Sequence, residues 1–275
     1  MKWVEISAYP STKRLQFLSD HLNAKGFENS LAFVDTTPAG FEDELTSAMQ
    51  TYDIIRIGRG LGSVVMQYFK KNTADVRHLG AADTIVKVDG EWWLANVTFP
   101  ALQRELSEIG TKLNISSEAL IVGAGASARA AVGAIVKMGF KTVNISNQFD
   151  EQAQDLIGDV KRKYFDVKFN FVPKDQLILL PGTNGIVINT TPFSPENDVL
   201  NELYYFNFLQ RPGVAMDLVL SPPETPLIKE ALGIQATVVC GYQVASWADV
   251  LWADWYLDLK LDHTEYEELL KQALI

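Results

Sequence analysis

Cysteine and histidine are scarce in this chain of 275 residues. Cys240 is its single cysteine, so the chain cannot form an internal disulfide, and nothing in it requires an oxidising compartment. The three histidines lie far apart, and neither His-x-x-x-His nor Cys-x-x-Cys occurs. Because zinc sites in proteins draw their ligands from such short spacings, we expect no metal site.

Excess positive charge and long apolar runs are also missing. The formal net charge is −10, which argues against a nucleic-acid partner because such affinity depends on lysine and arginine neutralising phosphates. The longest apolar stretch, residues 119–136, is interrupted by Arg129 and three glycines, and the opening MKWVEISAYPSTKR contains no apolar signal core. We therefore expect a cytoplasmic protein that does not enter a membrane. The sequence also lacks a Gly-x-Ser-x-Gly elbow and a Walker-type Gly-Lys-Ser/Thr, so nothing supports a hydrolase or a nucleoside triphosphatase.

The composition is that of an ordinary globular protein, with 47% hydrophobic and 21% charged residues, and the length suits two domains. Apolar runs alternate with helical patterns in two α/β series. The first series has predicted strands at 3–7, 31–35 and 53–57, a helix from a cap at Ser11 or Thr12 to Gly26, helices at 41–49 and 62–71, and an Asp89-Gly90 hairpin within 83–97.

The second series begins with a helical segment at about residues 100–112. Its predicted strands are 118–122, 142–146, 167–171, 185–189, 213–220 and 236–240, and its predicted helices are 126–138, 150–163 and 226–232. Runs of β-branched residues without alternation favour parallel strands buried on both faces. The tryptophan-rich tail, residues 244–261, is predicted to be helical and to pack back on the first series.

A glycine-rich turn joins the strand 118–122 to the following helix. It reads Gly123-x-Gly125-x-x-Ala128, with Ala126 and Ser127 at the start of the helix. In this position the first glycine permits a tight turn, the second lets the backbone approach a pyrophosphate, and Ala128 allows close helix–strand packing. The amino terminus of the helix offers N–H groups to phosphate. The context predicts dinucleotide binding, whereas a ligand-free turn is the alternative.

The residue after the next strand normally distinguishes NAD from NADP, because an acid binds the ribose 2′-hydroxyl and a basic residue binds the 2′-phosphate. This chain has Asn147 and Gln148 there, so neither charge is present. Asp150 either turns toward a ribose or complements the dipole of the following helix. NADP and NAD both remain candidate cofactors.

Several segments together resemble the shikimate/quinate dehydrogenase family. GAGASARAAV is similar to its nucleotide turn, VINTTP (187–192) to its Asn-Ala-Thr-Pro loop, MDLVLSPPETPL (216–227) to its Asp-x-x-Tyr-x-Pro-x-x-Thr-x-Leu segment, and LGAADTIVKVDGEWWLANVT to its Gly-Ala-Val-Asn-Thr hairpin. These strings occur in the family's order between about residues 79 and 250. The resemblance implies a two-domain α/β fold, with a substrate domain at 1–100 on which 245–275 pack and a Rossmann-type NAD(P)-binding domain at 101–244.

The same resemblance implies an NAD(P)-dependent oxidoreductase that acts on a small hydroxy acid or ketone between the domains. It extends the cofactor-binding residues to Thr190, Thr191, Pro192, Leu218 and Gly241. The substrate-binding residues it implies are Ser11 and Thr12, which stand for the family's Ser-x-Ser, together with Thr98 and Gln243, with Ser246 as the alternative to Gln243. A small-molecule carboxylate is the expected partner, and the chain is expected to be a monomer or a homodimer.

This sequence departs from the family at residues that carry the chemistry. The proton-transfer lysine is missing from Ile55-Arg-Ile-Gly-Arg-Gly60, its partner aspartate falls on Phe99, and a family asparagine falls on Asp83. The tyrosine of the Asp-x-x-Tyr segment is Leu220, and the arginine that holds the NADP phosphate is Gln148.

Oxidation of a hydroxyl needs a group that takes its proton. The candidates near these departures are Asp83 and Arg59, and further along His78. Asp83 either accepts a proton or is a capping carboxylate before the hairpin. Arg59, or Lys13 and Arg14, either bind a substrate carboxylate or belong to a solvated surface. The alternative function is a dinucleotide- or metabolite-binding protein that has lost dehydrogenase activity.

Overall fold

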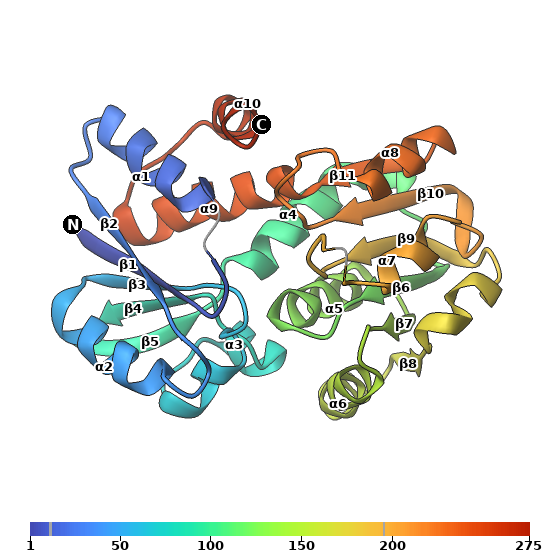
Figure 1. The fold of residues 1–275 in the computed structure, drawn as a ribbon, viewed down its shortest axis with the longest axis horizontal. Helices are drawn as coiled ribbons and strands as arrows, with labels where there is room; N and C mark the ends of the chain where they lie inside the picture. Colours follow the sequence, from blue (N-terminus) through green and yellow to red (C-terminus); the bar gives the residue numbers. More distant parts are fainter. Residues whose placement is uncertain (11–12, 195) are drawn as a thin grey trace. The chain divides into compact units, whose positions relative to one another are not determined.

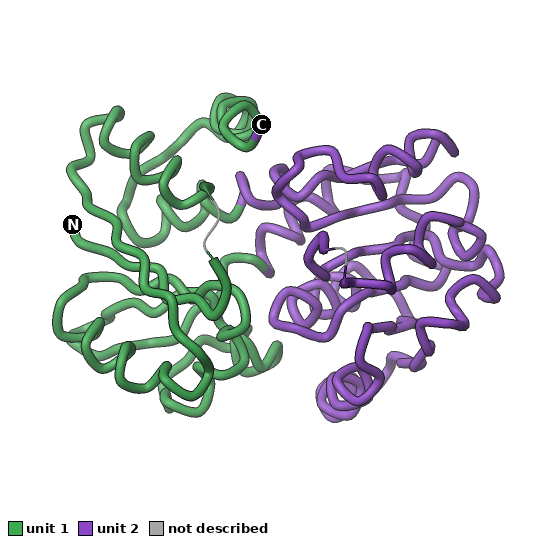
Figure 2. The backbone as a smooth tube through the Cα atoms, in the orientation of Figure 1, with its two compact units in different colours: residues 1–98, 248–274 green, residues 99–247, 275 purple. Residues whose placement is uncertain are grey.

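The computed structural model describes residues 1–10, 13–194 and 196–275. The chain forms two compact units, which Figure 2 shows in different colours. Unit 1 contains residues 1–98 and 248–274, and unit 2 contains residues 99–247 and 275. Each unit is an α/β structure, so the fold class predicted from the sequence is confirmed. Within the described ranges, no helix is long and apolar enough to cross a membrane.

Unit 1 is built on a five-stranded mixed sheet in the order β2-β1-β3-β4-β5 (Figure 1). The strands are β1 Lys2–Ser7, β2 Ser30–Asp35, β3 Ile54–Ile57, β4 Thr84–Val88 and β5 Glu91–Ala95. Strand β1 is parallel to β2 and β3, whereas β4 is antiparallel to β3 and β5. The predicted hairpin turn is confirmed, because Asp89 and Gly90 both have positive φ values, of 52° and 80°.

The helices of unit 1 come from both ends of the chain. They are α1 Lys13–Ala24, α2 Phe41–Thr51, the 3-10 helix η1 Val64–Tyr68, α3 Ala74–Leu79 and α10 His263–Ala273. The part of α9 Gly241–Leu257 from residue 248 onward also belongs to this unit. One face of the sheet packs on Phe41 and Leu45 of α2 through Val4, Ile6 and Ile55. Burial of this alternating apolar face is the main source of stability for the unit.

One helix prediction in this unit was wrong, and another was confirmed with different ends. The expected helix 62–71 is instead η1 followed by α3, because extended backbone at Phe69 ends the first and the Thr73 side chain caps the second by accepting from the Val76 N–H. The predicted helical tail 244–261 is helical up to Leu257, and its helix begins earlier, at 241. Asp258 has a φ of 53°, and Asp262 then caps α10.

Unit 2 is a doubly wound structure around six parallel strands in the order β11-β10-β9-β6-β7-β8. The strands are β6 Glu118–Val122, β7 Thr142–Ser146, β8 Lys168–Phe171, β9 Asn184–Asn189, β10 Leu209–Asp217 and β11 Thr237–Cys240. Numbered within the unit, this order is 6-5-4-1-2-3, that of the Rossmann fold. Every residue of the central strand β9 is buried, as expected for a parallel strand covered on both faces.

The helical segments of unit 2 are α4 Thr98–Ile109, η2 Gly110–Lys112, α5 Ala126–Met138, α6 Asp150–Lys161, η3 Lys174–Leu179, α7 Val199–Leu203 and α8 Pro226–Gly233. Leu177 of η3, Val199 and Leu203 of α7 and Leu227 of α8 share one buried cluster with strands β6, β9 and β10. The short segments η3 and α7 were not predicted, because one or two turns carry too few residues for a helical period.

Candidate functional site

Gly123 lies where the strand order of the parallel sheet reverses. It follows β6 with a φ of +120°, and a Cβ added to it would lie only 2.1 Å from the Thr190 Oγ1 atom. Thr190 follows the neighbouring strand β9, and its hydroxyl donates to the Val122 carbonyl at 2.8 Å. Any side chain at Gly123 would therefore push these two strand ends apart. In doubly wound folds, ligands bind in the crevice at this switch point.

The turn continues into helix α5 with space in front of it. Gly125 is the N-cap of α5, with no side-chain cap, and no atom lies within 4 Å of a Cβ built on it. Ala126 and Ser127 form the first turn of the helix, whose N–H groups have no partners within the helix. Ala128 is fully buried beneath them. A close-approach glycine, an open N-cap and a free helix amino terminus fit a pyrophosphate.

A buried polar network fixes the loop after β9, which contains Thr190, Thr191 and Pro192. The Asn189 side chain donates to Asp217 Oδ1 at 2.9 Å and accepts from the Thr191 hydroxyl at 2.6 Å. The Thr225 hydroxyl donates to Asp217 Oδ2 at 2.6 Å. Burial raises the pKa of the Asp217 carboxyl, against the effect of these hydrogen bonds. Asn189, Asp217 and Thr225 were not among the predicted site residues, although each lies in a segment that carried the family resemblance.

Leu218 and Gly241 lie together beside this loop. The Leu218 N–H donates to the Asn189 carbonyl at 3.0 Å, and a Cβ on Gly241 would lie 2.4 Å from the Val219 carbonyl oxygen and 2.8 Å from that of Leu218. The structure thus brings the first residue of α9 against the end of β10. This close backbone contact requires glycine, and it places two further predicted cofactor residues at the same edge of the sheet.

Gln243 and Ser246 follow on α9, and both are held by local hydrogen bonds. The Gln243 side chain accepts from the Cys240 N–H at 2.9 Å and donates to Glu105 at 3.3 Å. The Ser246 hydroxyl donates to the Gln243 carbonyl at 2.7 Å. Within unit 2, these contacts tie Gln243 to α4 and to the end of β11.

Asn147 and Gln148 end strand β7 on the same side of the sheet as the glycine turn. The Asn147 amide donates to the Phe149 carbonyl at 3.1 Å and to Gln152 at 3.0 Å, and the Gln148 amide donates to the Glu196 carbonyl at 2.7 Å. Both side chains are neutral, so the position that would face an adenosine ribose carries neither the acid typical of NAD enzymes nor a base for a 2′-phosphate.

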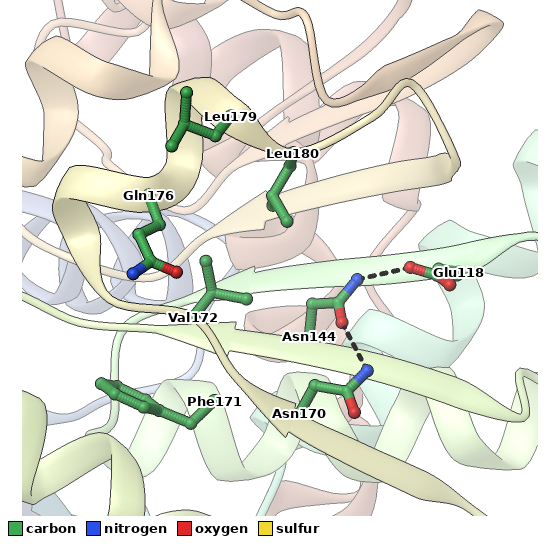
Figure 3. A pocket seen from close by; sticks show the side chains of 8 residues that line it. All are labelled: Glu118, Asn144, Asn170, Phe171, Val172, Gln176, Leu179 and Leu180. Atoms are coloured by element: carbon green, nitrogen blue, oxygen red, sulfur yellow. Dashed lines mark hydrogen bonds between the residues drawn. The ribbon is translucent and has the colours of Figure 1, made fainter.

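A cavity of about 350 Å³ lies elsewhere in unit 2, between strands β6, β7 and β8 and the segment 172–180 (Figure 3). A row of polar side chains crosses its floor: Asn144 donates to Glu118 at 2.8 Å, and Asn170 donates to Asn144 at 2.9 Å. Leu179 and Leu180 of η3 and the segment following it form another wall. None of the predicted site residues lines this cavity, so it is separate from the dinucleotide edge.

Asp83 and Thr98 meet in unit 1, at the end of the sheet where β1, β3 and β5 finish and β4 begins. Asp83 Oδ1 accepts from the Thr84 hydroxyl at 2.9 Å and from the Val97 N–H at 2.9 Å. Asp83 Oδ2 accepts from the Val97 N–H, the Thr98 N–H and the Thr98 hydroxyl at 3.0, 2.8 and 2.6 Å. The carboxylate therefore caps the start of α4, which is the structural role that the sequence left open.

Arg59 lies beside this end of the sheet, where its side chain contacts the loop after β1. Its Nη2 atom donates to the Pro10 carbonyl at 2.7 Å, and its guanidinium lies 5.8 Å from the centre of the Tyr9 ring. Ser11 and Thr12, the predicted carboxylate ligands, lie outside the described residues. The structure thus brings Asp83 and Thr98 into direct contact and leaves Arg59 on the adjacent loop.

The positions at which the family's lysine and aspartate are missing lie in different surroundings. Gly60, at the end of the segment from which the lysine is missing, has a φ of +84°. Phe99, which replaces the aspartate, is a buried residue of α4 with the Lys137 ammonium 5.4 Å from its ring centre. His78 lies exposed on α3 with its Nδ1 atom 3.2 Å from the Ala74 carbonyl. Lys13, the first residue of α1, is also exposed.

Arg14 is part of an ion pair that is largely buried, since its side chain is 17% exposed and that of Asp249 is fully buried. Its Nε and Nη2 atoms donate to the two oxygens of Asp249 at 2.9 and 2.7 Å, and the Tyr266 hydroxyl donates to the same carboxylate at 3.0 Å. Burial alone would lower the pKa of Arg14, but Asp249 raises it above its usual value. No sequence pattern indicated this pair, because its two members are separated by most of the chain.

Comparison with known proteins supports the same family. No family model matches the chain. It is 26% identical over 168 residues to the shikimate dehydrogenase (NADP(+)) of Shouchella clausii, covering 61% of this chain and 59% of that protein. It is 27% identical over 180 residues to the enzyme of the same name from Nitrosopumilus maritimus, covering 66% and 64%. The matches to these two relatives therefore span less than two thirds of their length. The match to the shikimate dehydrogenase (NADP(+)) of Maridesulfovibrio salexigens is 26% identical and spans 84% of this chain and 83% of that protein.

Solved structures have the same fold over the whole chain. Shikimate 5-dehydrogenase from Thermus thermophilus, in complex with NADP(H) and shikimate, aligns with a TM-score of 0.78 at 20% identity and covers 100% of both chains. Quinate dehydrogenase from Corynebacterium glutamicum, in complex with NAD, aligns with a TM-score of 0.82 at 18% identity and covers 98% of this chain and 97% of that one. The resemblance found in the sequence is confirmed.

Proposed function

Since the chain is similar to shikimate dehydrogenases in sequence and has the fold of shikimate and quinate dehydrogenases, we propose that it is an NAD(P)-dependent oxidoreductase. The reaction would transfer a hydride between the nicotinamide of NADP or NAD and a small hydroxy acid or ketone. The observation that carries this proposal is Gly123 packed against Thr190 at the switch point of the parallel sheet, before an open helix amino terminus.

Different residues at this edge of unit 2 would bind different parts of the dinucleotide. Gly123, Gly125 and the N–H groups of Ala126, Ser127 and Ala128 would hold the pyrophosphate, and Asn147 and Gln148 would face the adenosine ribose. The nicotinamide half would lie along Thr190, Thr191, Pro192, Leu218 and Gly241. When bound, the nicotinamide supplies the group that accepts or donates the hydride.

The candidate catalytic residues, Asp83 and Arg59, belong to unit 1. An alcohol that loses a hydride must also lose its hydroxyl proton, and a positioned carboxylate can accept it. In Asp83 the less crowded oxygen is Oδ1, which accepts two hydrogen bonds, whereas Oδ2 accepts three. We assign proton acceptance to Oδ1, substrate binding to Thr98, Gln243, Ser11 and Thr12, and an auxiliary contact with the substrate carboxylate to Arg59.

A second function has its own observation. The lysine of the family pattern is missing from residues 55–60. Phe99, which replaces the aspartate, is buried and apolar, so it can neither donate nor accept a proton. A dinucleotide- or metabolite-binding protein without dehydrogenase activity is therefore the alternative. For either function we propose a cytoplasmic monomer or homodimer whose partner is a small carboxylate, with no nucleic-acid partner.

Titration of the protein with NADPH and NADH, followed by tryptophan fluorescence, tests the cofactor. Binding of either dinucleotide supports both functions, whereas binding of neither at millimolar concentration would refute the oxidoreductase and leave only a metabolite-binding protein. Turnover is then measured with shikimate and quinate. Rates of about 1–10³ per second support the oxidoreductase. Binding without turnover of either compound favours the alternative.

A further inference from the structure

A row of polar residues crosses one face of the unit 1 sheet. The strand register places Glu5 of β1 next to Arg56 of β3, and Arg56 next to Thr84 of β4. Successive side chains of a strand alternate between its two faces, and Ile55 and Ile57 join the apolar core on the opposite side. The row therefore points toward the face on which α9 packs, where the Arg56 guanidinium lies 5.4 Å from the centre of the Trp252 ring.

Arg56 and Glu5 bury polar atoms that no hydrogen bond satisfies. Arg56 is only 5% exposed, and its Nε and Nη1 atoms are wholly buried without a partner in the described structure. The Glu5 Oε2 atom is also buried without a hydrogen-bond partner in the described structure. Buried polar atoms in folded proteins nearly always have partners, so an orphaned set indicates a missing water, ion or ligand. Arg14, by contrast, shows how this fold satisfies a buried arginine whose role is structural, since Asp249 accepts two hydrogen bonds from it.

The carboxylates around Arg56 act on it without forming an ion pair with it among the described residues. Arg14 and Asp249 neutralise each other, and Asp83 is occupied by the donors at the start of α4. The remaining neighbouring charge is Glu5, yet no ion pair joins it to Arg56 among the described residues. Burial lowers the pKa of Arg56, with Asp83 acting against this effect. A group that is acceptor-rich on one side and carries a hydroxyl on the other would satisfy Arg56 and Glu5 together.

We propose that Arg56 binds the carboxylate of the substrate and that Glu5 Oε2 accepts a hydrogen bond from one of its hydroxyls. The planar guanidinium matches a carboxylate in shape and charge, and the Trp252 ring holds its plane in place. This assignment rests on the proposed oxidoreductase function, whose candidate proton acceptor, Asp83, acts electrostatically on the same guanidinium.

Calorimetric binding of shikimate and of its methyl ester tests this assignment, because the ester keeps the hydroxyls and removes the carboxylate charge. We expect the wild-type protein to bind shikimate at least about tenfold more tightly than the ester. Arg56→Met should weaken shikimate binding by about 10–100-fold and leave ester binding unchanged, and Arg56→Lys should recover part of the loss. Arg77→Met, which alters an exposed arginine of the same unit, is the matched control and should change neither.

NADPH binding and thermal unfolding of each variant show whether it is folded. Equal affinity of the wild-type protein for the acid and the ester would overturn the assignment without any variant. It would also be overturned if Arg56→Met bound shikimate like the wild type, or if the wild type bound no shikimate at millimolar concentration. Arg56-dependent shikimate binding without NADPH binding would keep this assignment and refute the oxidoreductase. If Arg56→Met changed neither NADPH binding nor turnover, the oxidoreductase would stand and this assignment would be refuted.

Discussion

Gly123→Ala should destabilise unit 2 and abolish dinucleotide binding. The substitution adds one methyl group at a backbone φ of +120°, a conformation that residues with a Cβ rarely adopt. The new Cβ would lie 2.1 Å from Thr190 Oγ1, so either the β6 turn or the loop after β9 must move. Because Thr190 also donates to the Val122 carbonyl, that movement breaks the hydrogen bond joining the two strand ends.

The size of the effect follows from these contacts. Unfavourable backbone conformation contributes about 1–2 kcal/mol, and insertion of a methyl group into a closed contact contributes about 1–3 kcal/mol. We therefore expect the free energy of unfolding to fall by roughly 3 kcal/mol, which lowers the unfolding temperature of a unit of this size by roughly 6–12 °C.

Gly125→Ala is the matched comparison. Gly125 has a φ of −78°, and a Cβ built on it meets no atom within 4 Å. Its backbone therefore accepts alanine, and the gain from a less flexible unfolded chain roughly balances the weaker N-cap, for a net change within about 1 kcal/mol. The methyl group would nevertheless occupy the space that the pyrophosphate needs. We expect near-normal stability and a loss of NADPH binding.

Thermal unfolding by circular dichroism, with NADPH titration of the same samples, distinguishes these outcomes. A wild-type unfolding temperature for Gly123→Ala would show that the turn is not closed against Thr190. Unchanged NADPH affinity in Gly125→Ala would show that the cofactor does not approach this turn. The double variant Gly123→Ala/Thr190→Ala relieves the shortest contact, so it should recover part of the lost stability but retain the backbone contribution.

Three further substitutions test the two units separately. Asp83→Asn leaves one acceptor oxygen where the carboxylate accepts five hydrogen bonds, and it removes a negative charge from the start of α4. Urea unfolding should therefore show that the free energy of unfolding falls by about 1–3 kcal/mol. A variant as stable as the wild type would contradict the capping role. Gln148→Arg should favour NADPH over NADH by at least about tenfold, because an arginine there can bind the 2′-phosphate, and an equal shift in the two dissociation constants would argue against a ribose contact. Burial, followed by the charge of Lys25, lowers the pKa of His21 below 6.5. The unfolded chain therefore takes up this proton first, so the stability that neutral His21 contributes is complete above pH 6.5 and is lost as the pH falls through that value. His21→Gln should flatten the profile of unfolding temperature against pH between about pH 5 and 7, and an unchanged slope would contradict this reasoning.

Local sequence determined the parts of the fold that were predicted correctly. The hairpin at Asp89 and Gly90 depends on neighbouring residues only. The glycine spacing also indicated the turn at Gly123 and Gly125, although the contact of Gly123 with Thr190 comes from a distant segment. The break between η1 and α3 depends instead on the cap at Thr73, which the apolar spacing does not report.

Long-range pairing explains what the sequence missed in the candidate site. Arg14 and Asp249 are 235 residues apart, and no local pattern relates them. Arg56 did leave a signal, because it is the only charged residue within the strand Ile54–Ile57. A charge in a buried strand requires a partner, and the sequence alone did not show that Glu5 would lie beside it without forming an ion pair.

The replacement of the family lysine changes which kind of group can take a proton. Arg56 and Arg59 are the cations that the sequence supplies near Gly60, and a guanidinium remains protonated at physiological pH, so it can bind an anion but cannot act as a base. A carboxylate is then the group left to accept a proton, and of the carboxylates that act on Arg56, Asp83 has the largest effect, ahead of Asp249 and Glu5. Its capping bonds hold it in a single orientation, which suits a positioned base as well as a structural anchor. A dehydrogenase activity that survived Asp83→Asn in a folded protein would exclude it and leave Glu5 as the carboxylate of the Arg56 row to test next.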